Sequence, residues 1–551
     1  MNAKYLRTFS VIAIGIFIGA ACSKLYAAEL PALRGIVSSQ REGPMEGVLV
    51  SARKVGSRVT ISVVSNAAGL YAFPGERLEP GSYQLKARAA GYDLSDPGSV
   101  TIVRGKTLDL DLTLNPTKDL SSQMTNADWF YSNPQIKKRL VDDFKYGNNC
   151  MGCHSLSVVM KSKYTAEEWP SVLMNRMWQY AEAAIYEPRD GLRIPAMRGT
   201  RQPERPGMKE LAEFLASINL SARPDGTWPF ELKTLPRVKG KSTRVIITEY
   251  DLPRREAQPH DAAVAPDGTV WYTDVGNPYI GRLNPRTGDI KEWRLPKPAE
   301  PGDEPEHTFD IKFDSRGNPI VGSSLGVVRF DARTEKFTAW EDVPGGMVAI
   351  SPQGIVWTKD QGKYTMHRLD PNIGDIKVFP YPEARPMRFY GIEADSRGFV
   401  YGASLQLGLI GEMNGTTGEW KLYPTPTPNS GSRRGDVDKQ DRFWFAEYYA
   451  GKIGVLDTKT KQFKEWDIPP VPWSGPYDVV VDKNGEVWAS GEFTDNLFRL
   501  NPATGEVTSY PVSSGLYMQV QRVDVDNSTN PVTIWMGENH LARIAKVEPL
   551  D

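Results

Sequence analysis

The sequence PDGTVWYTD at residues 266–274 joins a tight turn to an apolar strand that has a tryptophan near its centre. The same unit returns along the chain at Trp357, Trp444, Trp488 and Trp535. Two of the spacings between these tryptophans are about twice the others, and strands around Val321 and Tyr401 occupy the missing places. The C-terminal part of the chain, residues 243–551, therefore repeats about every 44 residues, in seven units.

Each unit contains a second pair of short strands, such as Ile280–Asn284 followed by Ile290–Trp293. A repeat of 40–45 residues with four short strands is typical of a β-propeller blade. The first tail strand, Thr248–Pro253, has no unit before it, and the last unit around Trp535 lacks a tail of its own. We therefore expect a seven-bladed β-propeller in which the N-terminal strand completes the last blade and removes the exposed sheet edges.

The sequence CMGCH at residues 150–154 indicates a different chemistry. Two cysteines two residues apart, followed at once by a histidine, form the attachment signature of a c-type haem. Cys150 and Cys153 would hold the porphyrin covalently, and His154 would bind the iron as the proximal ligand. The alternatives are a redox-active cysteine pair, half of a zinc site, or chance. A zinc site usually has four ligands, and the only other cysteine is Cys22.

Helical periodicity surrounds this motif. A first helix is predicted after Pro134 and before Gly147, with the apolar stripe Ile136, Leu140, Val141 and Phe144. A second is predicted by the capping box of Thr165 and Glu168, with Trp169, Leu173 and Met177 on one face. A third begins at Pro206-Gly207, with the stripe Leu211, Leu215 and Ile218. This order resembles a class I-like cytochrome c domain over residues 128–222. The resemblance implies a methionine as the second axial ligand. It favours Met177, with Met174, Met197 and Met208 as the other candidates.

Residues 31–116 alternate apolar and polar positions between turns, as expected for short strands. The segments Asn66–Phe73, Leu78–Tyr83 and Ala89–Tyr92 occur in an order that resembles the carboxypeptidase regulatory-like domain, a small β-sandwich. The resemblance implies a folding or docking module without chemistry of its own. Residues 117–127 are polar and unpatterned, which predicts a linker.

The N-terminus has the features of a secretory signal. Lys4 and Arg7 precede an apolar run from Val11 to Ala21, and small residues follow at Ala27-Ala28. We expect a signal peptide over residues 1–28, no transmembrane segment in the mature chain, and a location in the bacterial periplasm. Lipid attachment at Cys22 is the minor alternative.

The overall charge excludes one class of partner. The chain has 66 basic and 67 acidic residues, and without the first 28 residues the mature protein would carry a net charge of about −4. Nucleic-acid-binding proteins usually present a basic surface, so a nucleic-acid partner is not expected. The plausible partners are a periplasmic redox protein or a small-molecule substrate.

The units of the propeller also resemble the virginiamycin B (streptogramin) lyase family, for example at Val270–Thr273 and Phe443–Glu447. That resemblance implies elimination by a histidine base with bound Mg²⁺. His260 and His307 occupy adjacent units and are the candidate catalytic residues. The acidic ligands are not where the family has them: Gln258, Asp274 and the stretch Gly322-Ser323-Ser324 stand in or near those places, so Mg²⁺ binding is doubtful. Glu304, Glu306 and Asp310 are the only acids close enough to His307 to rebuild a site.

Together these patterns predict a mainly β chain in which a small β-sandwich and an all-α cytochrome c-like domain precede a seven-bladed β-propeller. The expected function is periplasmic electron transfer by one covalent haem c, with the propeller holding a substrate or a partner protein. This role makes a haem-dependent oxidoreductase more plausible than a Mg²⁺-dependent lyase. The alternatives are a lyase carried by the propeller and a non-catalytic binding scaffold.

Overall fold

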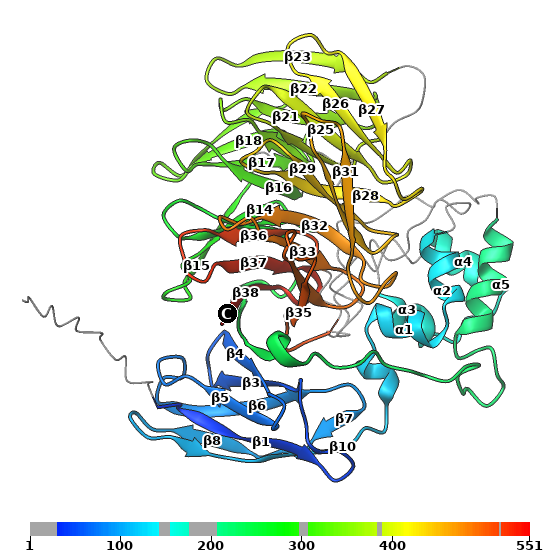
Figure 1. Cartoon of the computed structure of the whole chain (residues 1–551), viewed down its shortest axis with the longest axis vertical. Helices are drawn as coiled ribbons and strands as arrows, with labels where there is room; N and C mark the ends of the chain where they lie inside the picture. The colour runs from blue at the N-terminus through cyan, green and yellow to red at the C-terminus, as the bar shows by residue number, and fades with distance from the viewer. Residues whose placement is uncertain (1–29, 143–154, 176–206, 297–306, 383–387, 517–519) are drawn as a thin grey trace, which may run out of the picture.

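The computed structural model describes residues 30–142, 155–175, 207–296, 307–382, 388–516 and 520–551. Strands dominate these residues, which confirms a mainly β chain. Figure 1 shows three parts: an N-terminal β domain in blue, a group of helices in cyan to green, and a large array of sheets running from green to red.

The N-terminal β domain has two sheets that enclose one core. One sheet contains β1 (Leu33–Ser39), β2 (Gly43–Pro44), β5 (Leu70–Phe73), β7 (Tyr92–Leu94), β9 (Leu108–Asp109) and β10 (Leu112–Pro116); the other contains β3 (Leu49–Lys54), β4 (Val59–Val64), β6 (Gly81–Arg88) and β8 (Ser99–Ile102). Alternate residues of these strands point inward, and Tyr71, Phe73 and Tyr83 are among the largest side chains of the core. The alternation seen in the sequence therefore corresponds to a sandwich.

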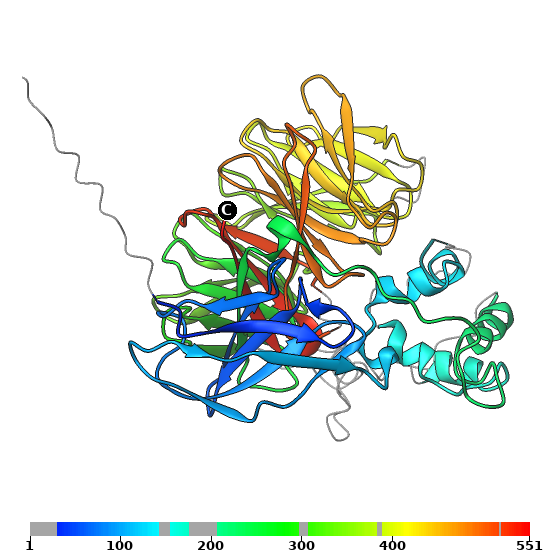
Figure 2. The ribbon, with the colours of Figure 1, turned by 60° about the horizontal axis from the view of Figure 1, so that its bottom comes forward.

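This β domain shares a sheet with the C-terminal part of the chain. Strand β11 (Val245–Asp251) pairs antiparallel with β38 (Arg543–Pro549) on one side and with β4 on the other, where Ile246 lies opposite Val63. The result is one continuous eight-stranded sheet in the order β36-β37-β38-β11-β4-β3-β6-β8. Figure 2 shows the blue domain directly against the red C-terminal strands. Backbone hydrogen bonds across β11 thus connect the two parts rigidly.

The remaining strands form six separate four-stranded antiparallel sheets. These are β12 (Pro259–Val264), β13 (Val270–Asp274), β14 (Tyr279–Leu283) and β15 (Ile290–Arg294); β16 (Thr308–Phe313), β17 (Pro319–Ser323), β18 (Gly326–Asp331) and β19 (Lys336–Trp340); β20 (Val348–Ile350), β21 (Val356–Asp360), β22 (Thr365–Asp370) and β23 (Asp375–Pro380); β24 (Gly391–Ala394), β25 (Phe399–Ser404), β26 (Leu409–Asn414) and β27 (Trp420–Pro424); β28 (Ser432–Val437), β29 (Phe443–Glu447), β30 (Lys452–Leu456) and β31 (Phe463–Asp467); and β32 (Pro476–Val481), β33 (Val487–Gly491), β34 (Asn496–Leu500) and β35 (Val507–Pro511). Strands β36 (Val523–Asp526) and β37 (Thr533–Glu538) belong to the shared sheet.

The first strands of these sheets surround a common axis. Each contacts the first strand of the next sheet, from β12 through β16, β20, β24, β28 and β32 to β36, and β36 contacts β12 again. The predicted tryptophan positions fall on the second strands, where Trp271, Trp444 and Trp488 are fully buried between neighbouring sheets. The pairing of β11 with β38 confirms that the strand at the start of the repeat region completes the last sheet.

The helices form a separate group, which we call the helical unit. It contains α1 (Asn126–Ser132), α2 (Gln135–Lys137), a π-helical turn η2 (Lys138–Asp142), α3 (Leu156–Met160), α4 (Trp169–Asn175) and α5 (Met208–Ile218). Ile136, Leu140 and Val141 are buried as predicted, while Phe144 and Gly147 lie outside the described residues. The predicted stripe Leu211, Leu215 and Ile218 of α5 is also buried.

Two capping boxes fix the starts of helices in this unit. The predicted one is confirmed: the Thr165 N–H donates to the Glu168 carboxylate at 2.9 Å, and the Glu168 N–H donates to the Thr165 hydroxyl at 3.4 Å. The other, Thr125 with Asp128, begins α1 inside the segment predicted as a linker. The linker prediction for 117–127 was therefore wrong in its second half, where a 3₁₀ turn η1 (Leu120–Gln123) precedes α1.

The last short elements are 3₁₀ turns. They are η8 (Gly240–Thr243), just before β11, and η9 (Asn539–Leu541), between β37 and β38. Within the described part of the chain, no helix combines the length and the apolar composition needed to cross a membrane.

Candidate functional site

The first strand of several sheets begins with a β-bulge, which directs side chains toward the common axis. In four sheets the pairing register skips two residues, which are His260-Asp261, Phe309-Asp310, Arg433-Arg434 and Tyr477-Asp478. When the strand pairings of the other three sheets are aligned with these four, Gly346, Tyr390 and Gln521 correspond to the first of the two skipped residues. We call the seven residues in the first place the axial ring: His260, Phe309, Gly346, Tyr390, Arg433, Tyr477 and Gln521. Bulges often direct functional side chains in this way.

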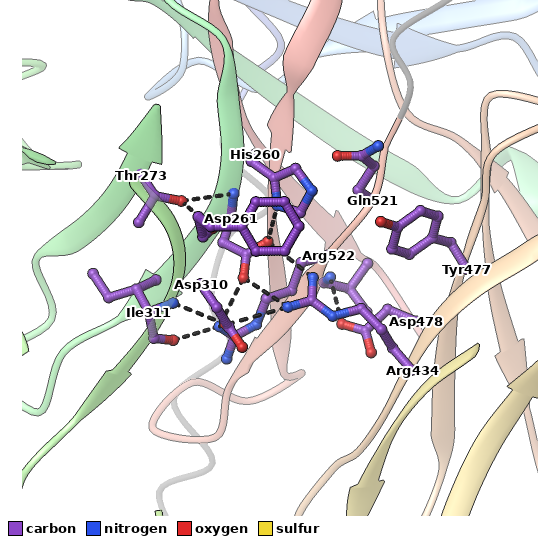
Figure 3. A network of polar contacts seen from close by, with 12 residues as sticks. His260, Asp261, Thr273, Asp310, Ile311, Arg434, Tyr477, Asp478, Gln521 and Arg522 are labelled. Atoms are coloured by element: carbon purple, nitrogen blue, oxygen red, sulfur yellow. Dashed lines mark hydrogen bonds and ion pairs between the residues drawn. The ribbon is translucent and has the colours of Figure 1, made fainter. Parts of the chain in front are cut away.

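Five of the residues in the second place are charged and buried close together, and we call them the axial plug: Asp261, Asp310, Arg434, Asp478 and Arg522. Arg434 binds Asp261 through both guanidinium nitrogens at 2.9 Å, and it also lies 3.2 Å from Asp310. Arg522 reaches the same two carboxylates, at 3.2 Å from Asp261 and 2.8 Å from Asp310. Figure 3 shows the two guanidinium groups facing the two carboxylates. A third carboxyl, that of Asp478, also faces the two guanidinium groups, and burial raises its pKa to about 7.

The plug gives its carboxyls different proton affinities. Burial alone would raise the pKa of Asp261, but Arg434, His260 and Arg522 outweigh it and hold that pKa well below its ordinary value. Burial raises the pKa of Asp310 to about 6, against the opposing effect of Arg434. Asp261 is therefore the carboxylate that stays ionised across the physiological range.

His260 lies above the plug. Its Nδ1 is 2.6 Å from the Asp261 carboxylate, and its ring packs against Phe309 with 4.2 Å between the centroids. Burial lowers the pKa of His260, although Asp261 acts in the opposite direction, so the imidazole is neutral near pH 7. A neutral imidazole oriented by a carboxylate is suited to accepting a proton or holding a polar ligand. Figure 3 shows His260, Gln521 and Tyr477 on the same side of the plug.

His307 stands just before β16, so it lies at the same end of the neighbouring sheet as His260, as predicted. Its backbone N–H donates to the Ser324 hydroxyl at 3.1 Å, which ties it to the stretch Gly322-Ser323-Ser324. Glu304 and Glu306 lie outside the described residues. Asp310, the remaining acid considered for a metal site, belongs to the axial plug.

Asp274, the other acid considered for Mg²⁺, is also engaged by an arginine. Asp274 forms an ion pair with Arg254 at 2.5 Å and accepts a hydrogen bond from the Gln258 backbone N–H at 3.1 Å. The Gln258 side-chain nitrogen is buried and has no hydrogen-bond partner among the described residues. Within the described ranges, no three His, Cys, Asp or Glu side chains come together in a way that could hold a metal ion. Asp274 and Asp310, the two described acids considered for Mg²⁺, are therefore both engaged by arginines.

Arg433 lies at the centre of an aromatic cluster that sequence reasoning missed. Its guanidinium carbon lies 3.5 Å from the ring centroid of Tyr477, 4.2 Å from that of Tyr448 and 4.8 Å from that of Tyr390. It also pairs with Glu492 at 3.1 Å, and both side chains are buried. The hydroxyls of Tyr390 and Tyr477 are hydrogen-bonded at 2.5 Å. We call Arg433, Tyr390, Tyr448 and Tyr477 the arginine–tyrosine cluster; desolvated cation–π contacts of this kind are strong.

The helical unit packs onto this cluster. Tyr448, Tyr477 and Phe493 belong to the same hydrophobic core as α1, α3, α4 and α5. Phe130 of α1 meets Phe493 edge-on at 5.1 Å, and Phe493 lies 4.8 Å from Tyr448. Aromatic contacts thus run without a break from the helical core to the axial ring.

Polar bonds fix the same interface. The Ala127 backbone N–H donates to the Phe493 carbonyl at 2.7 Å. The buried Lys137 ammonium donates to the Tyr449 carbonyl at 2.8 Å and pairs with Asp142 at 2.6 Å. The helical unit is therefore seated in one orientation on the end of the axis that carries His260.

The residues predicted to hold haem, Cys150, Cys153 and His154, lie outside the described residues, as do Met177 and Met197. Other residues of the segment 128–222 are described. Met208 is buried at the start of α5. Trp169 is 1% exposed, and its indole nitrogen has no hydrogen-bond partner among the described residues. A buried N–H donor without a partner is unusual in a folded protein, and an acceptor on a bound group would satisfy it.

Comparisons with known proteins cover different parts of the chain. Virginiamycin B lyase from Staphylococcus aureus is 20% identical, with a TM-score of 0.48, over 55% of this chain and 99% of that one. A streptogramin B lyase is 19% identical, with a TM-score of 0.48, over 56% and 99% of the two chains. The WD40 repeats of RRP9 are 10% identical, with a TM-score of 0.42, over 54% and 96%. No curated protein sequence matches the chain. Residues 32–115, the segment of strands β1–β10, match the family model of the carboxypeptidase regulatory-like domain.

Proposed function

We propose that the protein is an exported c-type cytochrome whose propeller holds a substrate or a partner protein against the haem-bearing helical unit. The observation that carries this proposal is the shared core of the helical unit and the arginine–tyrosine cluster. A unit packed in this way keeps a constant distance to the axial ring. Electron transfer requires such a fixed and short separation, whereas a purely structural appendage does not.

Cys150, Cys153 and His154 would hold the haem. Bound haem c would carry one electron at a time between its ferric and ferrous states. The chain directly after His154 is anchored: Ser155 caps α3 by accepting from the Ser157 N–H at 2.9 Å, and the Leu156 N–H donates to Asn126 at 3.0 Å. Trp169, whose buried indole N–H has no hydrogen-bond partner among the described residues, would be a donor for a polar group of the bound haem.

Met177 is our choice for the second axial ligand. It follows α4, the helix that carries Trp169 into the helical core. Met174, Met197 and Met208 remain the alternatives. A thioether ligand would favour the reduced form and raise the reduction potential relative to a second histidine.

We further propose that the six separate sheets and the four strands β36, β37, β38 and β11 are the blades of one seven-bladed propeller over residues 243–551. The proposed divisions before it are a signal peptide at 1–28, a β-sandwich at 31–116 and a haem domain at 128–222. Covalent haem attachment and an export signal together favour the periplasm. The proposed partner is a periplasmic redox protein or a small molecule that enters the axial ring.

The other two functions have less support. A lyase would need carboxylates free to bind Mg²⁺, and Asp274 and Asp310 are already paired with arginines. A binding scaffold would leave the continuous aromatic contact between the helical unit and the axial ring without a purpose.

The proposal is tested by staining for covalent haem. The protein, exported in a host that matures c-type cytochromes, should give a haem-stained band at full length on a denaturing gel. The double variant Cys150→Ala/Cys153→Ala should lose the stain, whereas Cys22→Ser, the matched change at the remaining cysteine, should keep it. An unstained wild-type band, or a stained double variant, would refute the proposal.

A further inference from the structure

Lys359 of β21 is a buried lysine without a partner. Its residue is only 9% exposed. Among the described residues its ammonium has no hydrogen-bond or ion-pair partner, and its contact is with the ring of Tyr390. Lysine is almost never buried unless it is paired. Lys312, on the neighbouring sheet, shows the usual arrangement, because its ammonium lies 2.6 Å from the Glu393 carboxylate. The unpaired state of Lys359 therefore calls for a reason other than stability.

The surroundings of Lys359 disfavour its charged form. The one opposing contact in the described part of the chain is with a ring: its nitrogen lies 6.0 Å from the ring centroid of Tyr390, the axial-ring residue of the next sheet, at the outer limit of a cation–π attraction. Burial and the Arg434 guanidinium lower the pKa of Lys359 to about 7, and the Asp310 carboxyl opposes them. Tyr390 before β24, Arg434 on β28 and Asp310 on β16 are thus the charged or titratable groups that face it. The neutral amine is therefore far more populated near pH 7 than in an ordinary lysine.

Open space lies at the axial-ring place of the sheet that carries Lys359. Gly346 holds the axial-ring place in the same sheet as Lys359, and it has a backbone φ of 96°. A Cβ atom added at Gly346 would meet no other atom within 4 Å. The axial ring therefore lacks a side chain in this sheet, while Tyr390 and its partner Tyr477 line the adjoining position.

We propose that Lys359 is a nucleophile that forms an imine with an aldehyde or ketone at the axial ring. The neutral amine nitrogen bonds to the carbonyl carbon and loses its two protons in the course of the reaction, and the carbonyl oxygen leaves as water with two protons, so no oxidant or reductant takes part. Buried lysines beside another cation commonly perform this chemistry. In the hydrogen-bonded pair of Tyr390 and Tyr477, one hydroxyl donates to the other, and the second hydroxyl proton remains for the carbonyl oxygen.

This activity goes beyond the proposed electron transfer and does not depend on haem. The test is reductive trapping on the full-length protein. Propanal and sodium cyanoborohydride at pH 7 convert an imine into a stable N-propyl lysine, which peptide mass spectrometry locates and quantifies. A lysine with the ordinary pKa of about 10.4 is roughly 0.04% neutral at pH 7, so the neutral fraction of Lys359 is about 10³ times larger. We expect Lys359 to be modified at least about tenfold faster than the exposed Lys439, with a rate that levels off above pH 7.

Two variants complete the experiment. Lys359→Arg keeps the positive charge and should lose only the modification at that position. The haem-free double variant Cys150→Ala/Cys153→Ala should label Lys359 as fast as the wild type, which separates this inference from the proposed function. Labelling of Lys359 no faster than that of Lys439 would overturn the proposal.

Discussion

The axial plug makes a quantitative prediction for the variant Asp261→Asn. The substitution keeps the size of the side chain but removes its negative charge. The Asp261 carboxylate oxygens lie 2.9 Å from both terminal nitrogens of Arg434, 3.2 Å from the Arg522 guanidinium and 2.6 Å from the His260 Nδ1. Two buried guanidinium groups would then face only the carboxyls of Asp310 and Asp478, whose pKa values burial raises to about 6 and about 7. Removing one partner of a buried ion pair costs about 3–5 kcal/mol. We expect that loss in the free energy of unfolding, a large share of the roughly 5–15 kcal/mol that stabilises a typical domain.

The assay is equilibrium unfolding in urea followed by tryptophan fluorescence, because Trp271, Trp444 and Trp488 are buried between the sheets. The matched control is Asp109→Asn, since Asp109 pairs with Arg34 at 2.6 Å but their side chains are 68% and 49% exposed. That change should cost less than about 1 kcal/mol. In the double variant Asp261→Asn/Arg434→Met, the loss should be smaller than the sum of the two single losses. If Asp261→Asn costs no more than the control, the plug does not hold the axis together.

Three further predictions concern other parts of the chain. Met177→Ala should remove the near-infrared sulfur-to-iron band of the oxidised protein and lower its reduction potential; the same effect from Met197→Ala alone would reassign the ligand. Burial raises the pKa of Glu447 to about 8 from an ordinary value of 4.5, so the protonated carboxyl stabilises the fold fully below pH 4.5, and this contribution is lost as the pH rises through 8. Glu447→Gln should therefore match the wild type in acid and exceed its stability in urea by up to about 5 kcal/mol above pH 8, whereas parallel pH profiles would contradict this. Phe493→Ala should cost about 3–5 kcal/mol and speed limited proteolysis between the helical unit and the propeller, and an unchanged cleavage rate would argue against the interface.

The repeat revealed most of the β architecture because each unit carries its own local signal. Tryptophans recur on the second strands, and turns such as the one at 266–268 separate the strands. The pairing of β11 with β4 had no such signal, because backbone hydrogen bonds between distant strands leave little trace in side-chain pattern. The start of α1 did have one: Thr125 and Asp128 stand at capping-box spacing within the segment interpreted as a linker.

The candidate site was predicted only in part. His260 and His307 were found because a resemblance singled them out. Asp261 and Arg434 are 173 residues apart, and only the alignment of the repeats shows that both hold the same place in their sheets. Lys359 carries no motif at all. Its significance comes from missing partners, which is a property of the packed protein and not of the sequence around it.

The central claim is that this chain carries redox-active haem c. The most direct measurement is the reduced-minus-oxidised absorption spectrum of the purified, exported protein, with haem and protein quantified in the same sample. The account predicts the difference bands of a c-type cytochrome with one haem per chain, and their loss in Cys150→Ala/Cys153→Ala. A featureless difference spectrum from correctly exported protein would contradict it.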